Sequence, residues 1–120
     1  MKLYNILNNL IIENNTRDEV NNAINNRALV NIYYDGDDNT HSGQRTIEVY
    51  SFGMSRGGNL VIRAYQVAGD TNTFQPSWKM FRLDRITRWE TSNMKFSTPR
   101  PNYNRMGDNS MSTVYNTVKF

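Results

Sequence analysis

The sequence predicts a mainly β fold with flanking helices: a small antiparallel barrel, preceded by an amphipathic helix and followed by a C-terminal extension. Four segments rich in Val, Ile, Tyr and Phe follow one another, as is typical of strands. Stretches with Gly, Asn, Asp or Pro separate them and indicate chain reversals. The first fifteen residues instead repeat their apolar side chains with a helical period.

The N-terminal element, residues 1–15, predicts one amphipathic helix. Its apolar stripe has the i, i+3, i+4, i+7, i+8 spacing and consists of Leu3, Ile6, Leu7, Leu10 and Ile11. A helix of this length is marginal in isolation, so we expect residues 3–12 to dock on the rest of the domain, on a second copy or on another protein. Its polar face carries Asn rather than Lys, which argues against a membrane surface.

The domain itself is expected over residues 16–96. Thr16 or Asp18 is suited to cap a second, short helix that turns Val20, Ala23 and Ile24 inward. The four strands are expected at residues 28–35, 45–54, 59–67 and 78–89. Four consecutive antiparallel strands after a helix favour a strongly bent sheet that curls towards a barrel.

Residues 97–120 form the predicted C-terminal extension, which is rich in Pro, Asn and Ser. Composition alone would suggest disorder. The segment nevertheless holds several large apolar residues, so we expect it to lie on a surface: Tyr103, Met106, Met111, Tyr115 and Phe120. The final run spaces Met111, Val114, Tyr115 and Val118 as in a short helix.

Composition excludes several classes of protein. The chain has 120 residues and no Cys, so disulfide scaffolds and thiolate metal sites are excluded, and the single His41 is insufficient for a His cluster. No segment has the length of a membrane span or the pattern of a signal peptide. We therefore expect one domain inside the cell, with no cofactor and no metal.

Charge is distributed unevenly along the chain. Residues 1–44 carry three basic and six acidic side chains, whereas residues 45–105 carry ten basic and four acidic ones. Ten of the fourteen cations are Arg, whose planar fork pairs with phosphate and stacks on rings. An anionic partner such as a polynucleotide is one interpretation, and a solvated basic face is the other.

Motifs for catalysis or metal binding are weak. "DGDDN" (35–39) resembles a calcium loop, but Thr40 stands where that loop needs Gly. "RGGN" (56–59) lies between two strands and indicates a hairpin turn. His41 and Ser42 lie near carboxylates in sequence, yet a catalytic site needs groups held rigidly by separate elements. We expect no enzymatic activity.

The basic strands give the stronger signal. In an extended strand, successive side chains face opposite sides, so Arg63 and Tyr65 share the face opposite Ile62 and Ala64. An Arg beside an aromatic ring is suited to bind a phosphate and stack a base, although a structural cation–π contact explains the same pattern. Arg82 and Arg85 are three residues apart and require a bulge or curvature to face one way; otherwise one of them, more plausibly Arg85, is structural.

In order and content, these segments resemble the WYL domain family. The resemblance covers about residues 17–90, and "FRLDRI" (81–86), "RAYQ" (63–66) and Arg45 are its most specific parts. One departure is that Leu60, Val61 and Ile62 stand where the family's name-giving Trp, Tyr and Leu would fall. The resemblance implies an Sm-like or SH3-like barrel.

It also implies a non-enzymatic sensor or binding module that engages single-stranded nucleic acid or a nucleotide-like ligand through a basic patch. WYL domains usually follow a helix-turn-helix in bacterial regulators or accompany CRISPR and helicase proteins, whereas this chain looks like a stand-alone, bacteriophage-type member in the cytoplasm of a bacterial host. The positions that match the patch are Arg45, Arg63, Tyr65, Arg82 and Arg85, with Lys79 at its edge.

Two rival readings come from other classes. The chain could be a phage virion component that docks on neighbours through residues 3–12 and the C-terminal run, with its basic strands against packaged nucleic acid. It could also sequester a signalling nucleotide or bind a host protein. Phosphate binding weakens steeply as salt rises, whereas an apolar docking interface does not respond in this way.

Overall fold

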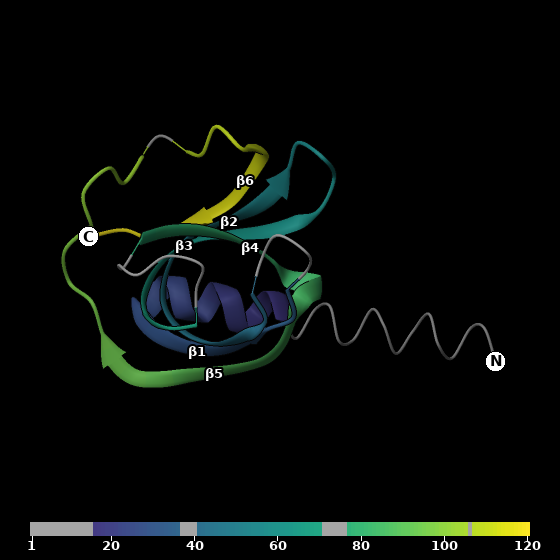
Figure 1. The fold of residues 1–120 in the computed structure, drawn as a ribbon. Coiled ribbons are helices and arrows are strands. Elements are labelled where there is room, and N and C mark those ends of the chain that lie inside the picture. The colour runs from purple at the N-terminus through teal and green to yellow at the C-terminus, as the bar shows by residue number, and fades with distance from the viewer. Residues whose placement is uncertain (1–15, 37–40, 71–76, 106) are drawn as a thin grey trace.

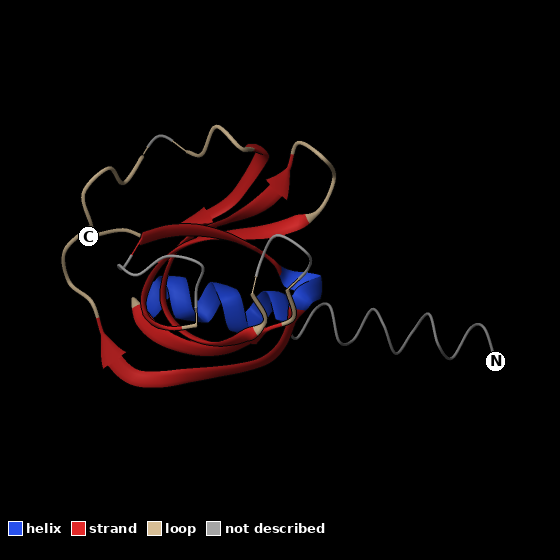
Figure 2. Cartoon of the chain, viewed as in Figure 1, coloured by secondary structure: helices blue, strands red, loops and turns tan. Residues whose placement is uncertain are grey.

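The structure is a computed structural model that describes residues 16–36, 41–70, 77–105 and 107–120. The predicted helix over residues 3–12 lies outside these ranges. The predicted second helix is confirmed at residues 16–26, with Val20, Ala23 and Ile24 fully buried. Figures 1 and 2 show this helix framed by the strands of a curled sheet. In the described part of the chain, no helix is both long and apolar enough to cross a membrane.

Within the described ranges, the sheet is antiparallel and has six strands, with the order β4-β3-β2-β1-β5 and β6 paired to β2. In chain order these are β1 (Ala28–Tyr34), β2 (Gly43–Ser55), β3 (Leu60–Gly69), β4 (Ser77–Arg82), β5 (Ile86–Lys95) and β6 (Met111–Thr117). The long strand β2 pairs with β1 through its first half and with β6 through its second half, along the same edge.

Across the curled sheet, the edge strand β4 is joined to β1 by contacts of Tyr34. Among the described residues, no ladder joins β4 to β5, so closure into a complete barrel stays a prediction. Tyr34, at the end of β1, contacts Phe81 of β4 edge-on, with ring centroids 4.9 Å apart. Its Oη also accepts a hydrogen bond from the backbone N–H of Arg82 at 3.2 Å.

Two sequence predictions are wrong. The expected strand over 78–89 is divided by a short 3₁₀ helix, η1 (Leu83–Arg85), which separates β4 from β5. The carbonyl of Arg85 accepts a bond from the N–H of Asp35 at 2.7 Å, which holds this corner against the end of β1. The expected C-terminal helix is instead strand β6, because the free edge of β2 offers backbone partners that helical spacing does not reveal.

Core residues lie in two layers, one on each side of the sheet. The inner layer joins the helix to the concave face through fully buried aliphatic side chains and Phe81. On the other side, residues 96–105 and 107–120 cover β2, β3 and β4, and Tyr50 packs there against Trp78 and Tyr103 at centroid distances of 4.6 and 4.9 Å. The prediction that the extension lies on a surface is therefore confirmed.

Candidate anion-binding site

The six predicted binding residues lie in three different places. Ladder pairing places Arg63 opposite Met80 and Tyr65 opposite Trp78, all on the outer face of the sheet. Lys79 pairs with Ala64 and shares the inner face with Arg45, while Arg82 immediately precedes the turn η1 and Arg85 is its last residue. The sheet brings Arg45 and Lys79 together and separates them from the other four residues.

On the outer face, Arg63 is held by the chain itself. Its Nε and Nη2 donate to the two carboxylate oxygens of Asp108 at 2.6 and 3.2 Å. The pKa of Asp108 is lowered, chiefly by this hydrogen bond from Arg63 and against the opposing effect of burial. The alternation of side chains along the strand therefore predicted the correct face for Arg63, but the carboxylate of Asp108 already binds its guanidinium.

Tyr65 is covered by another cation of the C-terminal extension. The guanidinium of Arg100 lies 4.8 Å from the centre of its ring. Arg100 also donates twice, at 3.0 Å each, to the carboxylate of Glu48, which is 3% exposed. The sequence analysis counted Arg100 as a cation but assigned it no role, because its carboxylate partner Glu48 is 52 residues away in the chain.

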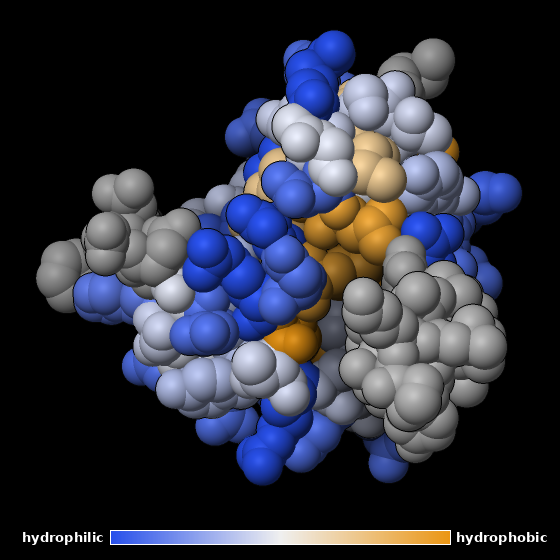
Figure 3. Space-filling view, turned by 90° about the vertical axis from the view of Figure 1, so that its right-hand side faces the viewer, coloured by the Kyte–Doolittle hydropathy of each residue, from blue (hydrophilic) through white to orange (hydrophobic). Residues whose placement is uncertain are grey.

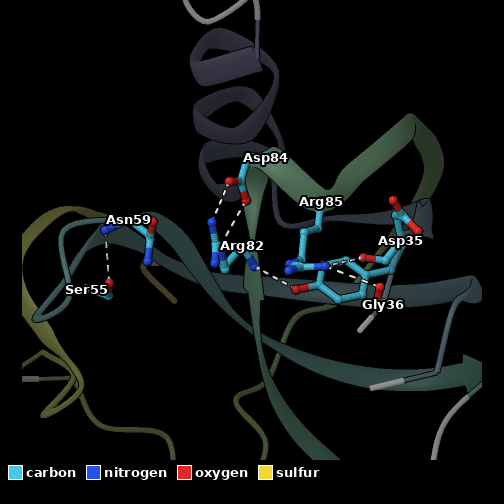
Figure 4. Close-up of polar contacts among 8 residues, drawn as sticks. Asp35, Gly36, Ser55, Asn59, Arg82, Asp84 and Arg85 are labelled. Atoms are coloured by element: carbon cyan, nitrogen blue, oxygen red, sulfur yellow. Dashed lines mark hydrogen bonds and ion pairs between the residues drawn. The ribbon is translucent and has the colours of Figure 1, made fainter. Parts of the chain in front are cut away.

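At the η1 corner, Arg82 and Arg85 differ in their partners (Figure 4). Arg82 forms a two-point contact with Asp84, at 3.0 and 2.6 Å. Arg85 donates to the backbone carbonyls of Asp35 and Gly36 at 3.4 and 3.2 Å, while the carboxylate of Asp35 points away. Both arginines therefore fix the local chain.

The surrounding surface is mixed in character. Figure 3 shows the side of the molecule on which η1 lies, where apolar surface reaches the exterior at the centre and hydrophilic groups border it.

Arg45 is the most deeply buried of the six, with 2% of its surface exposed. Its guanidinium lies between two rings, 5.4 Å from the centre of Tyr34 and 5.3 Å from that of Phe81. Its Nη1 donates to Oε1 of Gln66 at 3.1 Å, and its Nη2 donates to the carbonyl of His41. Gln66 and Tyr34 are site residues that the sequence analysis did not identify.

No carboxylate within the described ranges forms an ion pair with Arg45, and its Nε–H has no hydrogen-bond partner there. Burial lowers the pKa of Arg45, while Tyr34 and the charge of Asp70 act in the opposite direction. An arginine remains charged under such a shift. A cation with an unsatisfied donor is therefore held inside the curled sheet.

Lys79 brings a second positive charge to the same face. Burial lowers its pKa first, and the neighbouring charge of Arg45 lowers it further. Lys79 is partly exposed, so this second cation is accessible from solvent. Two cations that repel each other beside an unsatisfied guanidinium N–H form a site suited to an anion with several acceptor oxygens.

Comparison with known proteins gives one match. A family model described as "WYL domain" matches residues 15–91, which is more than half of the chain. Searches of curated proteins and of solved structures gave no significant match. The matched range contains all six predicted residues and both cations of the inner site, and it ends before the C-terminal extension.

Proposed function

Because the chain belongs to the WYL domain family, we propose that it is a non-enzymatic, regulatory binding module for a nucleotide or for a phosphate end of single-stranded nucleic acid. The phosphate is bound at Arg45 and Lys79, on the inner face of the curled sheet. Gln66 and the rings of Tyr34 and Phe81 orient the guanidinium that receives it.

One observation carries this proposal: Arg45 is buried, has no carboxylate partner among the described residues, and lies beside a second cation. A buried charge is costly unless it is paired, and like charges add to that cost. Proteins retain such an arrangement mainly where function requires it. A bound phosphate offsets both costs, since it satisfies the Nε–H of Arg45 and screens Lys79.

The remaining arginines favour a compact ligand over a long polynucleotide track. Arg63 and Arg82 are each occupied by a carboxylate of the chain, and Arg100 by Glu48. A strand of nucleic acid crossing the outer face would have to displace these contacts. A mononucleotide, or the terminal phosphate of a strand, needs only the inner site.

The test compares a short single-stranded oligothymidylate with and without a 5′-phosphate, together with thymidine 5′-monophosphate, by calorimetric titration at low and high salt. We expect the phosphorylated ligands to bind more tightly and the affinity to fall as salt rises. Lys79→Met is expected to weaken binding about tenfold, because it removes a charged hydrogen-bond donor.

Lys95→Met is the matched control, since it removes the same charge from an exposed position on β5. It should leave the affinity within about twofold of the unmodified protein, because long-range charge effects are screened by salt. Equal binding of the phosphorylated and unphosphorylated strands, or equal losses in the two lysine variants, would refute the proposed site.

A further inference from the structure

A cavity of about 300 Å³ lies between the outer face of the sheet and the C-terminal extension. Ser51, Arg63 and Trp78 line it from the sheet, and residues 102–104 and 107–110 line it from the extension. Its volume is at the lower end of the range for small-molecule pockets, which suits a single ring system. The extension lies beyond the range of the family match, so this cavity is a separate feature of the chain.

The part of the extension that forms the wall is fixed in place before any ligand binds. Asp108 accepts from Arg63 and from the backbone N–H of Ser110 at 2.8 Å. Arg56 donates through Nε to the carbonyl of Asn109 at 2.8 Å. A preformed wall reduces the ordering cost of binding.

The charge inside the cavity is balanced. Arg63 and Asp108 neutralise each other at 2.6 Å, and their side chains are 25% and 11% exposed. A phosphate entering here would meet the Asp108 carboxylate. The cavity therefore favours a neutral ligand, in contrast to the inner site.

The walls combine flat rings with groups that both donate and accept hydrogen bonds. The rings of Trp78 and Tyr103 are nearly parallel, inclined by 20° with centroids 6.3 Å apart, and the indole is held by a bond from its Nε1 to the carbonyl of Pro101 at 2.8 Å. Asn102 and Asn109 add side-chain amides. Amides match the donor and acceptor edges of nucleobases, and bases stack on aromatic rings.

Ser51 adds a polar residue to the sheet side of the cavity. This residue is 2% exposed and lines the cavity. A serine hydroxyl can both donate and accept a hydrogen bond, so it is suited to the polar edge of a ligand.

We propose that this cavity binds a neutral planar heterocycle, namely a nucleobase or its nucleoside, stacked on Trp78 and read by Ser51 and the asparagine amides. A planar ring contacts the flat walls over its whole face, whereas a puckered sugar contacts them only in part. The site lies on the opposite face of the sheet from Arg45 and Lys79, so it does not depend on the anion site.

The test uses the fluorescence of Trp78. The chain has two tryptophans, so Trp89→Phe leaves Trp78 as the only indole. In this background, adenosine, guanosine, cytidine and uridine are titrated in turn, with glucose as a non-planar comparison. We expect saturable quenching by at least one nucleoside, with an affinity that does not change with salt because the ligand is uncharged.

Two substitutions locate the binding. Ser51→Ala removes the hydroxyl without adding volume at this buried position, and we expect about fivefold weaker binding. Asn102→Gly removes an amide at a position with φ of 70°, where glycine is tolerated without strain, and should weaken binding to a similar extent.

Lys95→Met, which removes a charge from an exposed position on β5, serves as the control and should bind nucleosides with unchanged affinity. Unchanged melting temperatures of the Ser51 and Asn102 variants would show that both still fold. Absence of saturable quenching by all four nucleosides, quenching by glucose alone, or equal nucleoside affinity with and without the Ser51 hydroxyl would overturn the proposal.

Discussion

Arg63 and Arg82 each make a two-point contact with one aspartate, and the two pairs differ in how much water reaches them. The aspartate side chain is 11% exposed in the pair of Arg63 with Asp108, but 63% exposed in the pair of Arg82 with Asp84. Exposed pairs contribute little because water and salt screen them, whereas breaking a partly buried pair leaves an unsatisfied charge.

Asp108→Asn should therefore lower the free energy of unfolding at neutral pH by about 1–3 kcal/mol, whereas Asp84→Asn should change it by less than about 0.5 kcal/mol. Urea denaturation checks both values. Because the pKa of Asp108 is lowered below its ordinary 3.8, its contribution is present above that pH and is lost as the pH falls through the folded-state pKa. Equal losses of unfolding free energy in Asp108→Asn and Asp84→Asn would contradict the larger contribution assigned to the pair of Arg63 with Asp108.

Lys79 should destabilise the unliganded protein, because its pKa is lowered by burial and by Arg45. Lys79→Met should therefore raise the melting temperature at neutral pH while it weakens ligand binding. A lysine with a lowered folded-state pKa binds fewer protons than the unfolded chain from that pKa up to 10.5. The difference in melting temperature between Lys79→Met and the unmodified protein should therefore shrink as the pH rises through this window. A difference that stays constant would show that the charge of Lys79 does not destabilise the protein.

The face of the sheet to which a side chain points could be predicted from the sequence, but its hydrogen-bond partner could not. The two-residue period placed Arg63 and Tyr65 opposite the buried Ile62 and Ala64, as the structure has them. The partner of Arg63 lies 45 residues further along the chain, within a segment whose composition resembles a disordered tail. No local pattern indicates such a contact.

At the scale of elements, the C-terminal extension changes what the sheet presents. Strand β6 pairs with β2 where β1 no longer does, and the residues before it cover the outer face. The spacing of Met111, Val114, Tyr115 and Val118 suggested a helix, but an available strand edge outweighed this weak periodicity. Helix 16–26 and most strands were predictable because their apolar periods are local.

Gly53 allows β6 to pair with β2, because a side chain at residue 53 would collide with the β6 backbone. An added Cβ would overlap the carbonyl oxygen of Thr113 and approach the Sδ of Met111 to 2.8 Å. Gly53→Ala should therefore cost about 1–3 kcal/mol of unfolding free energy and speed hydrogen exchange in β6.

Gly57→Ala is the matched control, since its added Cβ would find its nearest neighbours at 3.9 Å. Gly57→Ala should change neither the free energy of unfolding nor the hydrogen exchange in β6 appreciably. Unaltered exchange in β6 of the Gly53 variant would show that the strand does not depend on this close approach.

For the whole molecule, the curled sheet separates two chemically different regions. The inner face holds Arg45 and Lys79, and no carboxylate of the described ranges is paired with Arg45. The outer face pairs Arg63 and Arg100 with acidic groups and leaves a neutral cavity. The mainly β fold was predictable from the strand segments and their turns. Whether the sheet closes, and which arginines are already neutralised, depends on contacts distant in sequence.

The most direct test of the inner site is to observe which arginine receives the anion. In a ¹⁵N-labelled protein titrated with thymidine 5′-monophosphate, we expect the Nε–H resonance of Arg45 to shift progressively to saturation. The Nε–H of Arg63, held by Asp108 on the opposite face, should stay in place. A stationary Arg45 resonance, with shifts confined to Arg63 or Arg82, would contradict phosphate binding at Arg45 and Lys79.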